Sequence, residues 1–278
     1  MTTRNSSRMP RRARAAAHAG TLLAACLTAL LPPARAEAPT EAEAAALVAD
    51  SWARYRQGVT TELEQVRLQI SRAGQATETK RLSRWTQFAP QGERVSIRFA
   101  EPAADRGQGL LILQERGGAA PAPAQMWLRM PSWPQARRIT GDREGRYFGG
   151  TDLSFEDNRQ LLGEHTPTFR YRVLQAEAGH WQIEALPREP ASSSYGRRLL
   201  TLSRPSLAIT EIQYFDRQGA LIKTQRHESL QLEGTRWRAQ VVSVDNVQER
   251  SRTVLTIEQR RLNEPLPDRT FTPQFLVE

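Results

Sequence analysis

From Thr60 to the end of the chain, apolar and polar residues alternate. Apolar side chains recur at every second position, which predicts β-strands with one buried face each. Turn signals containing Gly or Pro separate these stretches. The strands are predicted around residues 66–70, 76–88, 95–99, 109–115, 124–130, 169–173, 181–185, 207–215, 220–231, 236–246 and 252–262. Strands at this spacing, joined by tight turns, are typical of an antiparallel meander that curls into a barrel.

Three segments depart from this alternation. Residues 41–56 place apolar side chains on one helical face, and Thr40 with Glu43 suits a capping box at its start. Residues 148–163 predict a glycine turn and a short helix, with Ser154 as N-cap and Gly163 as the C-terminal cap. Residues 101–108 are polar and rich in helix and strand breakers, so we expect a loop or a single helical turn there.

Residues 1–36 have the pattern of an export leader. The segment begins with several arginines, has no acidic residue, continues with the apolar run 21–31, and ends in Ala34-Arg35-Ala36. A spanning helix needs about 20 apolar residues, so this pattern predicts a secretion signal instead. We expect cleavage after Ala36 and a periplasmic protein.

A second cleavage site is present within the same segment. Leu23-Ala24-Ala25-Cys26 resembles a lipobox, in which Cys26 would carry lipid and become the new N-terminus. The apolar run continues past Cys26, which favours cleavage after Ala36, but a protein anchored through Cys26 stays an alternative.

The predicted leader changes the charge of the mature chain. It holds six of the 39 basic residues, which leaves 33 basic against 30 acidic side chains after cleavage. This small excess is not concentrated in any one segment, so no nucleic-acid partner is expected. Residues 37–278 have one uniform composition and predict a single domain, in which the absence of any further cysteine excludes an internal disulfide.

The mature chain has no recognisable catalytic or metal-binding motif. His165, His180 and His227 are widely spaced, so neither a metal site nor a cofactor is expected. Asp152, Glu156 and Asp157 form the best carboxylate cluster, but acids at the start of a helix are better explained by its dipole. The sequence therefore favours a binding protein over an enzyme.

Three stretches resemble the family of LolA-like outer-membrane lipoprotein-sorting proteins, in particular the branch associated with exporters of the RND/MMPL type. The first is residues 126–132 (MWLRMPS) followed by Arg137-Arg138-Ile139. The second, which is the most specific, is residues 148–157 (FGGTDLSFED). The third is residues 214–223 (YFDRQGALIK), with residues 268–272 (DRTFT) resembling the family's C-terminal segment.

This resemblance implies a half-open antiparallel β-barrel whose helices lie across an apolar cavity. Helix 41–56 and the short helix after Ser154 would then be lid elements. Sheltering an acyl chain contributes about 0.8 kcal/mol per methylene, so a chain of about 14 carbons gains on the order of 10 kcal/mol before ordering costs. The candidates for the cavity lining hold aromatic or aliphatic positions on the predicted strands: Val66, Leu68, Ile97, Phe99, Leu113, Trp127, Trp181 and Tyr214. Arg137, Arg138 and Asp152 are the candidates for a polar rim.

The function implied is that of a periplasmic carrier. It would shelter a lipid or lipoprotein acyl chain and pass it between an inner-membrane RND/MMPL-type transporter and an outer-membrane acceptor. The alternative is a sensor of the same fold that contacts an anti-sigma factor or another envelope-stress partner.

Overall fold

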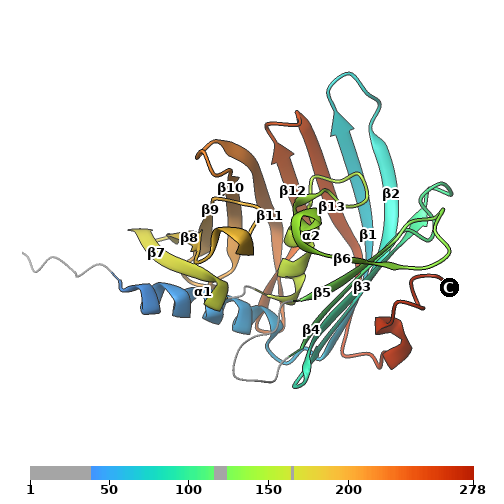
Figure 1. Cartoon of the computed structure of the whole chain (residues 1–278). Helices are drawn as coiled ribbons and strands as arrows, with labels where there is room; N and C mark the ends of the chain where they lie inside the picture. Colours follow the sequence, from blue (N-terminus) through green and yellow to red (C-terminus); the bar gives the residue numbers. More distant parts are fainter. Residues whose placement is uncertain (1–38, 116–123, 164–165) are drawn as a thin grey trace, which may run out of the picture. The chain divides into compact units, whose positions relative to one another are not determined.

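The computed structural model describes residues 39–115, 124–163 and 166–278. The predicted leader, Cys26, Ala36 and His165 lie outside these described residues. Figure 1 shows a strongly curved sheet, with α1 and α2 on its concave side.

The described strands form one 13-stranded antiparallel sheet. Their order is β6-β5-β4-β3-β2-β1-β13-β12-β11-β10-β9-β8-β7, so two meanders are joined where β1 pairs with β13. The first meander comprises β1 (Thr61–Arg72), β2 (Glu78–Ala89), β3 (Gly92–Glu101), β4 (Gly109–Glu115), β5 (Gln125–Arg129) and β6 (Arg137–Ile139). The second comprises β7 (Phe169–Ala176), β8 (His180–Pro187), β9 (Arg197–Ser203), β10 (Ile209–Phe215), β11 (Leu221–Glu233), β12 (Arg236–Asn246) and β13 (Ser251–Leu262). The sheet does not close, because β6 and β7 lie at opposite ends of this order.

The helices agree with the sequence pattern. The helix α1 (Glu41–Arg56) has the predicted bounds, and its capping box is formed by Thr40 and Glu43. The short helix α2 (Phe155–Arg159) begins after the N-cap Ser154 and continues into the 3-10 helix η2 (Gln160–Leu162), which ends at Gly163. The remaining 3-10 helices are η1 (Gly141–Gly145), η3 (Thr166–Thr168), η4 (Pro190–Ser192) and η5 (Asp268–Phe271).

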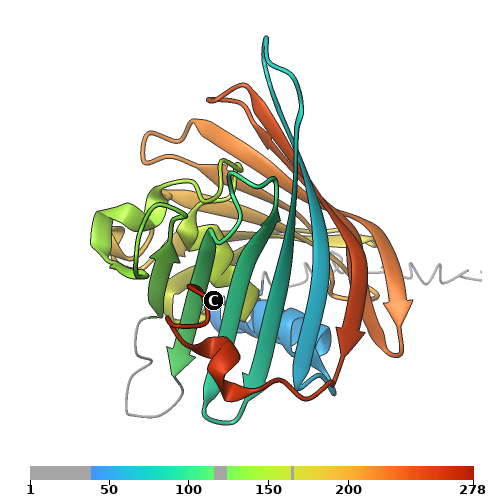
Figure 2. The same ribbon diagram turned by 90° about the vertical axis from the view of Figure 1, so that its right-hand side faces the viewer.

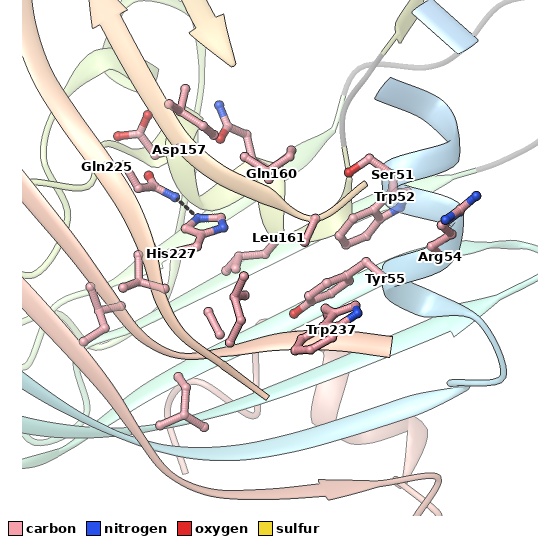
Figure 3. A pocket seen from close by; sticks show the side chains of 18 of the residues that line it. Ser51, Trp52, Arg54, Tyr55, Asp157, Gln160, Leu161, Gln225, His227 and Trp237 are labelled. Carbon is pink, nitrogen blue, oxygen red and sulfur yellow. Dashed lines mark hydrogen bonds between the residues drawn. The ribbon is translucent and has the colours of Figure 1, made fainter. Parts of the chain in front are cut away.

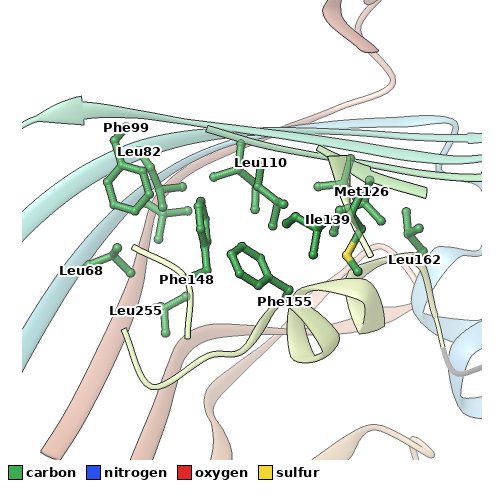
Figure 4. Packing of buried hydrophobic residues seen from close by; sticks show 14 of the residues in the cluster. Leu68, Leu82, Phe99, Leu110, Met126, Ile139, Phe148, Phe155, Leu162 and Leu255 are labelled. Carbon is green, nitrogen blue, oxygen red and sulfur yellow. The ribbon is translucent and has the colours of Figure 1, made fainter. Parts of the chain in front are cut away.

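Two apolar clusters fill the concave side. In the first, Phe148 and Phe155 pack against strand residues such as Leu110 (Figure 4). In the second, Ala44 and Val48 of α1 pack against strands β7 to β10. Because α2 belongs to one cluster and α1 to the other, the concave side is divided between the two helical elements.

A third cluster lies on the opposite, convex face of the first meander. Phe271 and Leu276 of the C-terminal segment pack against Leu111, whose neighbours Leu110 and Ile112 belong to the first concave cluster. Figure 2 shows this C-terminal segment on the outer side of the sheet. The convex side of the first meander is therefore also buried, which explains the continuous apolar run of β4.

Candidate functional site

A pocket of about 190 Å³ lies between α1, the α2–η2 segment and strands β10 to β13. Its wall is mainly apolar and is formed by Leu153, Leu161, Ile209, Ile212, Leu230, Val242, Leu255 and Ile257, among others. Figure 3 shows Trp52, Tyr55 and Trp237 near α1, on the opposite side of the pocket from Asp157 and Gln225. A cavity with such a wall holds an apolar group, and the polar side chains within it set how that group is oriented.

The helix α1 forms one side of the pocket. Ala44 and Val48 attach the helix to the second cluster, while Trp52 and Tyr55 reach the pocket one and two turns later. The rings of Trp52 and Tyr55 stack with their centroids 4.9 Å apart. The 3.6-residue period thus gives α1 a single face that both packs and lines the pocket.

The segment before α2 reaches the sheet through a glycine turn. Gly149 has a φ of +66°, and a side chain there would collide with the ring of Phe99, since an added Cβ would lie 2.5 Å from Cζ. The carboxylate of Asp152 then accepts hydrogen bonds from the hydroxyls of Ser251 and Thr253 on β13. These contacts explain the glycine and aspartate of the stretch 148–157 as structural residues that hold α2 inside the curved sheet.

A buried ion pair fixes α2 to β11. Nζ of Lys223 donates to Asp157 and to the backbone oxygen of Asp152, and both charged side chains of the pair are at most 1% exposed. Asp157 also accepts a hydrogen bond of 2.8 Å from the hydroxyl of Tyr195. The second and third stretches that resemble the LolA-like family therefore meet here, because Asp152 and Asp157 belong to one and Lys223 to the other.

A chain of polar side chains runs along one wall of the pocket. The hydroxyl of Tyr214 lies within hydrogen-bond distance of the Oε1 atoms of Gln160 and Gln225, at 3.2 and 3.1 Å, and Nε2 of Gln225 lies 2.8 Å from Nε2 of His227. Desolvation by the surrounding protein lowers the pKa of His227 to about 4, so its imidazole is neutral at pH 7. This wall offers neutral hydrogen-bonding groups to a ligand.

A cluster of charged side chains lies at the Tyr55 side of the pocket. Glu64 bonds Arg84 and Arg260 through Nε atoms at 2.6 and 2.8 Å, and Glu62 bonds Nη1 of Arg238 at 2.8 Å. Arg260 also lies 3.0 Å from Glu62, which links these pairs into one network. We call Glu62, Glu64, Arg84, Arg238 and Arg260 the guanidinium cluster.

The two carboxylates of this cluster titrate in opposite directions. Burial raises the pKa of Glu62, and the neighbouring charge of Glu64 raises it further. Burial alone would also raise the pKa of Glu64, but Arg84 and Arg260 outweigh it and hold that pKa below its usual value. Burial raises the pKa of Tyr55, which lies against the cluster, to about 12. Glu64 is therefore the more firmly ionised carboxylate of the two.

The eight predicted lining residues occupy three different clusters. Val66, Leu68, Ile97 and Phe99 are buried in the first concave cluster, and Trp181 and Tyr214 belong to the second. Leu113 and Trp127 pack instead with Leu111 and the C-terminal segment on the convex face, because alternation along a strand does not reveal which face is concave. None of the eight is among the residues that line the described pocket, so their role as lipid contacts stays a prediction.

The predicted polar rim is also dispersed. Arg137 and Arg138 are exposed on β6, where their guanidinium groups stack on Trp133 and Trp127 at 4.4 and 5.8 Å from the ring centroids. Asp152 is 4% exposed and satisfied by β13, so it serves the attachment of α2. The structure does not bring these three residues together.

The sequence prediction did not include the residues that do line the pocket. Trp52 and Tyr55 lie within the predicted helix 41–56, and the apolar face of that helix is the sequence signal for them. Arg84 and Arg260 gave no local signal, but Glu62 and Glu64 continue the alternation of Val66 and Leu68. Charged residues at positions where the pattern requires buried ones indicate an internal charge cluster.

A family model matches residues 91–278, and its description reads "Uncharacterized protein". The chain belongs to this family. No curated protein matches the chain.

Several solved structures share the fold. An outer membrane lipoprotein-sorting protein domain from Vibrio parahaemolyticus superposes with a TM-score of 0.76 at 20% identity, covering 86% of this chain and 100% of that one. A DUF1329 family protein from Desulfovibrio piger gives a TM-score of 0.76 at 21% identity, with coverage of 86% and 100%. A LolA superfamily protein from Nitrosomonas europaea gives 0.62 at 18% identity, with coverage of 84% and 98%. These similarities confirm the predicted LolA-like half-open barrel.

The described ranges contain neither a membrane-spanning helix nor a cluster of metal ligands. No helix there has both the length and the apolar character needed to cross a membrane. Nor do the described residues contain a group of three or more His, Cys, Asp or Glu side chains suited to hold a metal ion.

Proposed function

We propose that this protein is a periplasmic carrier that shelters a lipid or lipoprotein acyl chain in the pocket between α1 and strands β10 to β13. The observation that carries the proposal is the pocket itself, since its wall is mainly apolar and two helical elements cover it. An acyl chain that crosses water exposes its apolar surface to the solvent, and an apolar pocket wall removes that surface from water again. The LolA-like fold supports the same role.

The size of the pocket indicates that binding requires movement. An engineered apolar cavity of about 150 Å³ binds benzene, so a cavity of about 190 Å³ holds only part of a long acyl chain. A longer chain therefore requires α1 or the α2–η2 segment to move away from the sheet. Such a movement would also open a route for release to a partner.

Dye displacement and native mass spectrometry test the carrier function. The exported protein is purified from cells, its lipids are extracted, and binding of the fluorescent dye N-phenyl-1-naphthylamine is measured. Ala208→Trp would fill the pocket and is expected to weaken dye binding at least tenfold, whereas Ala103→Trp, on an exposed loop, should leave it unchanged. Equal binding by both variants, together with no co-purifying lipid, would contradict the proposal.

The mass of the mature protein tests both its export and its possible lipid anchor, because it shows where the N-terminus lies. We propose that residues 37–278 form a single domain released by cleavage after Ala36. An intact mass that begins at Glu37 supports a diffusing carrier, while a lipid-modified N-terminus at Cys26 would show a tethered one. A mass that retains the arginine-rich segment 1–25 contradicts export through a cleaved leader.

The transfer partners are proposed from the resemblance alone. We propose an inner-membrane transporter of the RND/MMPL type and an outer-membrane acceptor. Cross-linking in whole cells, followed by mass spectrometry of the captured proteins, tests this pairing. Capture of an anti-sigma factor in place of a transporter would favour the sensor.

A further inference from the structure

The guanidinium cluster lies at the end of the pocket where α1 and the β11–β12 hairpin meet. Arg84, Arg260 and Tyr55 line the pocket directly. Arg238 lies behind the Tyr55 ring, with its guanidinium carbon 3.9 Å from the ring centroid. The charged network therefore forms part of the pocket wall on this side.

Among the side chains of this network that are at most 13% exposed, arginines outnumber carboxylates. Three arginines face two carboxylates that are at most 4% exposed, and the third acid in contact, Glu233, is 26% exposed. Burying an arginine without full compensation is costly, and proteins rarely retain such an arrangement without a partner for it.

Arg238 has hydrogen-bond donors that no described residue accepts. Its side chain is fully buried, and Nη1 donates to both oxygens of Glu62. Its Nε and Nη2 atoms have no hydrogen-bond partner among the described residues. A bound anion could replace Glu62 as a partner of Arg260. Glu62 would then still be paired with Arg238, which has unused N–H donors. The network can therefore bind an anion without leaving a carboxylate unpaired.

The pocket reaches solvent on the same side. Trp237, which lines it, is 41% exposed, and Arg54 at the end of α1 also contributes to the wall. The apolar side chains Leu161, Ile212 and Val242 belong to the rest of the pocket wall. The wall thus has arginines at one end and apolar side chains elsewhere, and this arrangement matches a molecule that has a charged end and an apolar tail.

We infer that the pocket binds a single-chain anionic amphiphile, with its carboxylate or phosphate against Arg84 and Arg260 and its tail towards Leu161 and Val242. This inference rests on the proposed function and narrows it, because a fully esterified acyl group has no anionic end to place there. The arginines determine specificity, and the apolar wall supplies most of the binding free energy.

A matched pair of ligands tests the charge requirement. Binding of fluorescent cis-parinaric acid to the exported protein is compared with binding of its methyl ester, which has the same tail and no charge. The acid should bind at least tenfold more tightly than the ester. Equal affinities would overturn the anion site and leave the carrier function standing, whereas failure of both ligands to bind would contradict the carrier function as well.

Single substitutions test whether the guanidinium cluster is where the anionic group binds. Arg84→Gln should weaken binding of the acid about tenfold and leave the ester unchanged, while Arg67→Gln, in a half-exposed pair with Glu258, should change neither. Glu62→Gln removes a competing carboxylate and should tighten binding of the acid several-fold. If Arg84→Gln does not fold, Glu62→Gln still tests the anion site. Unchanged or weaker binding of the acid by Glu62→Gln would overturn the inference.

Inorganic phosphate distinguishes an amphiphile from a free anion. Millimolar phosphate should not displace parinaric acid, since phosphate alone lacks the tail. A lysophosphatidic acid should displace it at concentrations comparable to those of the fatty acid. Displacement by phosphate alone would show that the site recognises a free anion, and the amphiphile would then be excluded.

Discussion

At the scale of single residues, the most consequential contact is the buried pair of Lys223 and Asp157. We expect Lys223→Met to destabilise the fold by about 3–5 kcal/mol, because it leaves Asp157 buried without its cation. Urea unfolding of the exported protein measures this change. The exposed pair of Arg81 and Glu101 provides a control, and Arg81→Met should change the stability far less than Lys223→Met, because solvent screens an exposed pair.

A double variant separates the pair from its surroundings. Adding Asp157→Asn to Lys223→Met removes the unpaired charge and should recover part of the lost stability. Strict additivity of the two single changes would contradict a direct coupling between these side chains.

Glu62 gives the guanidinium cluster a distinctive pH dependence. Its pKa is raised to about 7 in the folded protein, so its contribution to stability is complete below about pH 4.5 and is lost as the pH rises through 7. Glu64 and His227 have lowered pKa values and act in the opposite direction, losing their contributions as the pH falls through about 2 and about 4. The groups that face Glu62 are Glu64, Tyr55, Arg84, Arg238 and Arg260, with Glu233 bonded to Arg260.

Comparison with Glu62→Gln isolates this titration. The variant keeps the shape of the side chain and retains His227, whose contribution is common to both proteins. The stability of Glu62→Gln relative to the unmodified protein should therefore increase between pH 5 and pH 8. Thermal unfolding across this range measures the difference, and a constant difference would show that Glu62 does not titrate there.

The sequence allowed the burial of single residues to be predicted, but not the face of the sheet on which they lie. Alternation marked Val66 and Leu68 as buried, and they are. It could not assign Leu113 and Trp127 to the convex face, because that depends on a C-terminal segment packing there. It also gave no role to Glu62 and Glu64, although both hold buried positions of the same alternation, because their partners Arg84 and Arg260 lie far away in the sequence.

At the scale of elements, the contact between η2 and α1 controls how the pocket is covered. Gly163 has a φ of +108°, and an added Cβ would lie 2.2 Å from Nε1 of Trp52. Gly163→Ala should therefore displace the Trp52 ring and cost about 1–3 kcal/mol through overpacking and backbone strain. We expect a shift in tryptophan fluorescence together with stronger binding of N-phenyl-1-naphthylamine as the pocket opens.

Gly74→Ala is the matched control for this variant. Gly74 also has a positive φ, of +75°, but an added Cβ there meets nothing within 4 Å. It should lower stability through backbone strain alone and leave dye binding unchanged. If both variants changed dye binding equally, contact between Gly163 and Trp52 would not govern access to the pocket.

Most elements could be predicted, and the exceptions have local causes. The bounds of α1 and the capping of α2 were confirmed because their caps are encoded by neighbouring residues. Strand β9 was not predicted, since Arg198 occupies a buried position of its alternating pattern. Strand β6 was not predicted either, because its length of three residues is too short for a period to show.

At the scale of the whole described fold, the decisive contact joins the two meanders. The pairing of β1 with β13 connects residues about 190 positions apart, such as Leu68 and Leu255. No local pattern encodes this pairing, and neither the alternation nor the motifs predicted it. The half-open form was predicted by the resemblance, while periodicity alone indicated a barrel.

The pocket lies between the two concave clusters, so a ligand should stabilise the fold as a whole. The wall combines Leu255 and Ile257 of the first cluster with Val48 and Ile212 of the second. A ligand present at 100 times its dissociation constant adds about 2.7 kcal/mol to the unfolding free energy. For a domain of this size that corresponds to a rise of roughly 5–10 °C in Tm.

Cis-parinaric acid is the ligand for this measurement, and Ala208→Trp is the control with a filled pocket. The unmodified protein should show the rise as a single cooperative transition, since the ligand contacts both clusters. Ala208→Trp should show almost none at the same ligand concentration. Two separate transitions, of which only one moved with ligand, would mean that the pocket belongs to one cluster alone, and α1 and α2 would then not act together in covering the ligand.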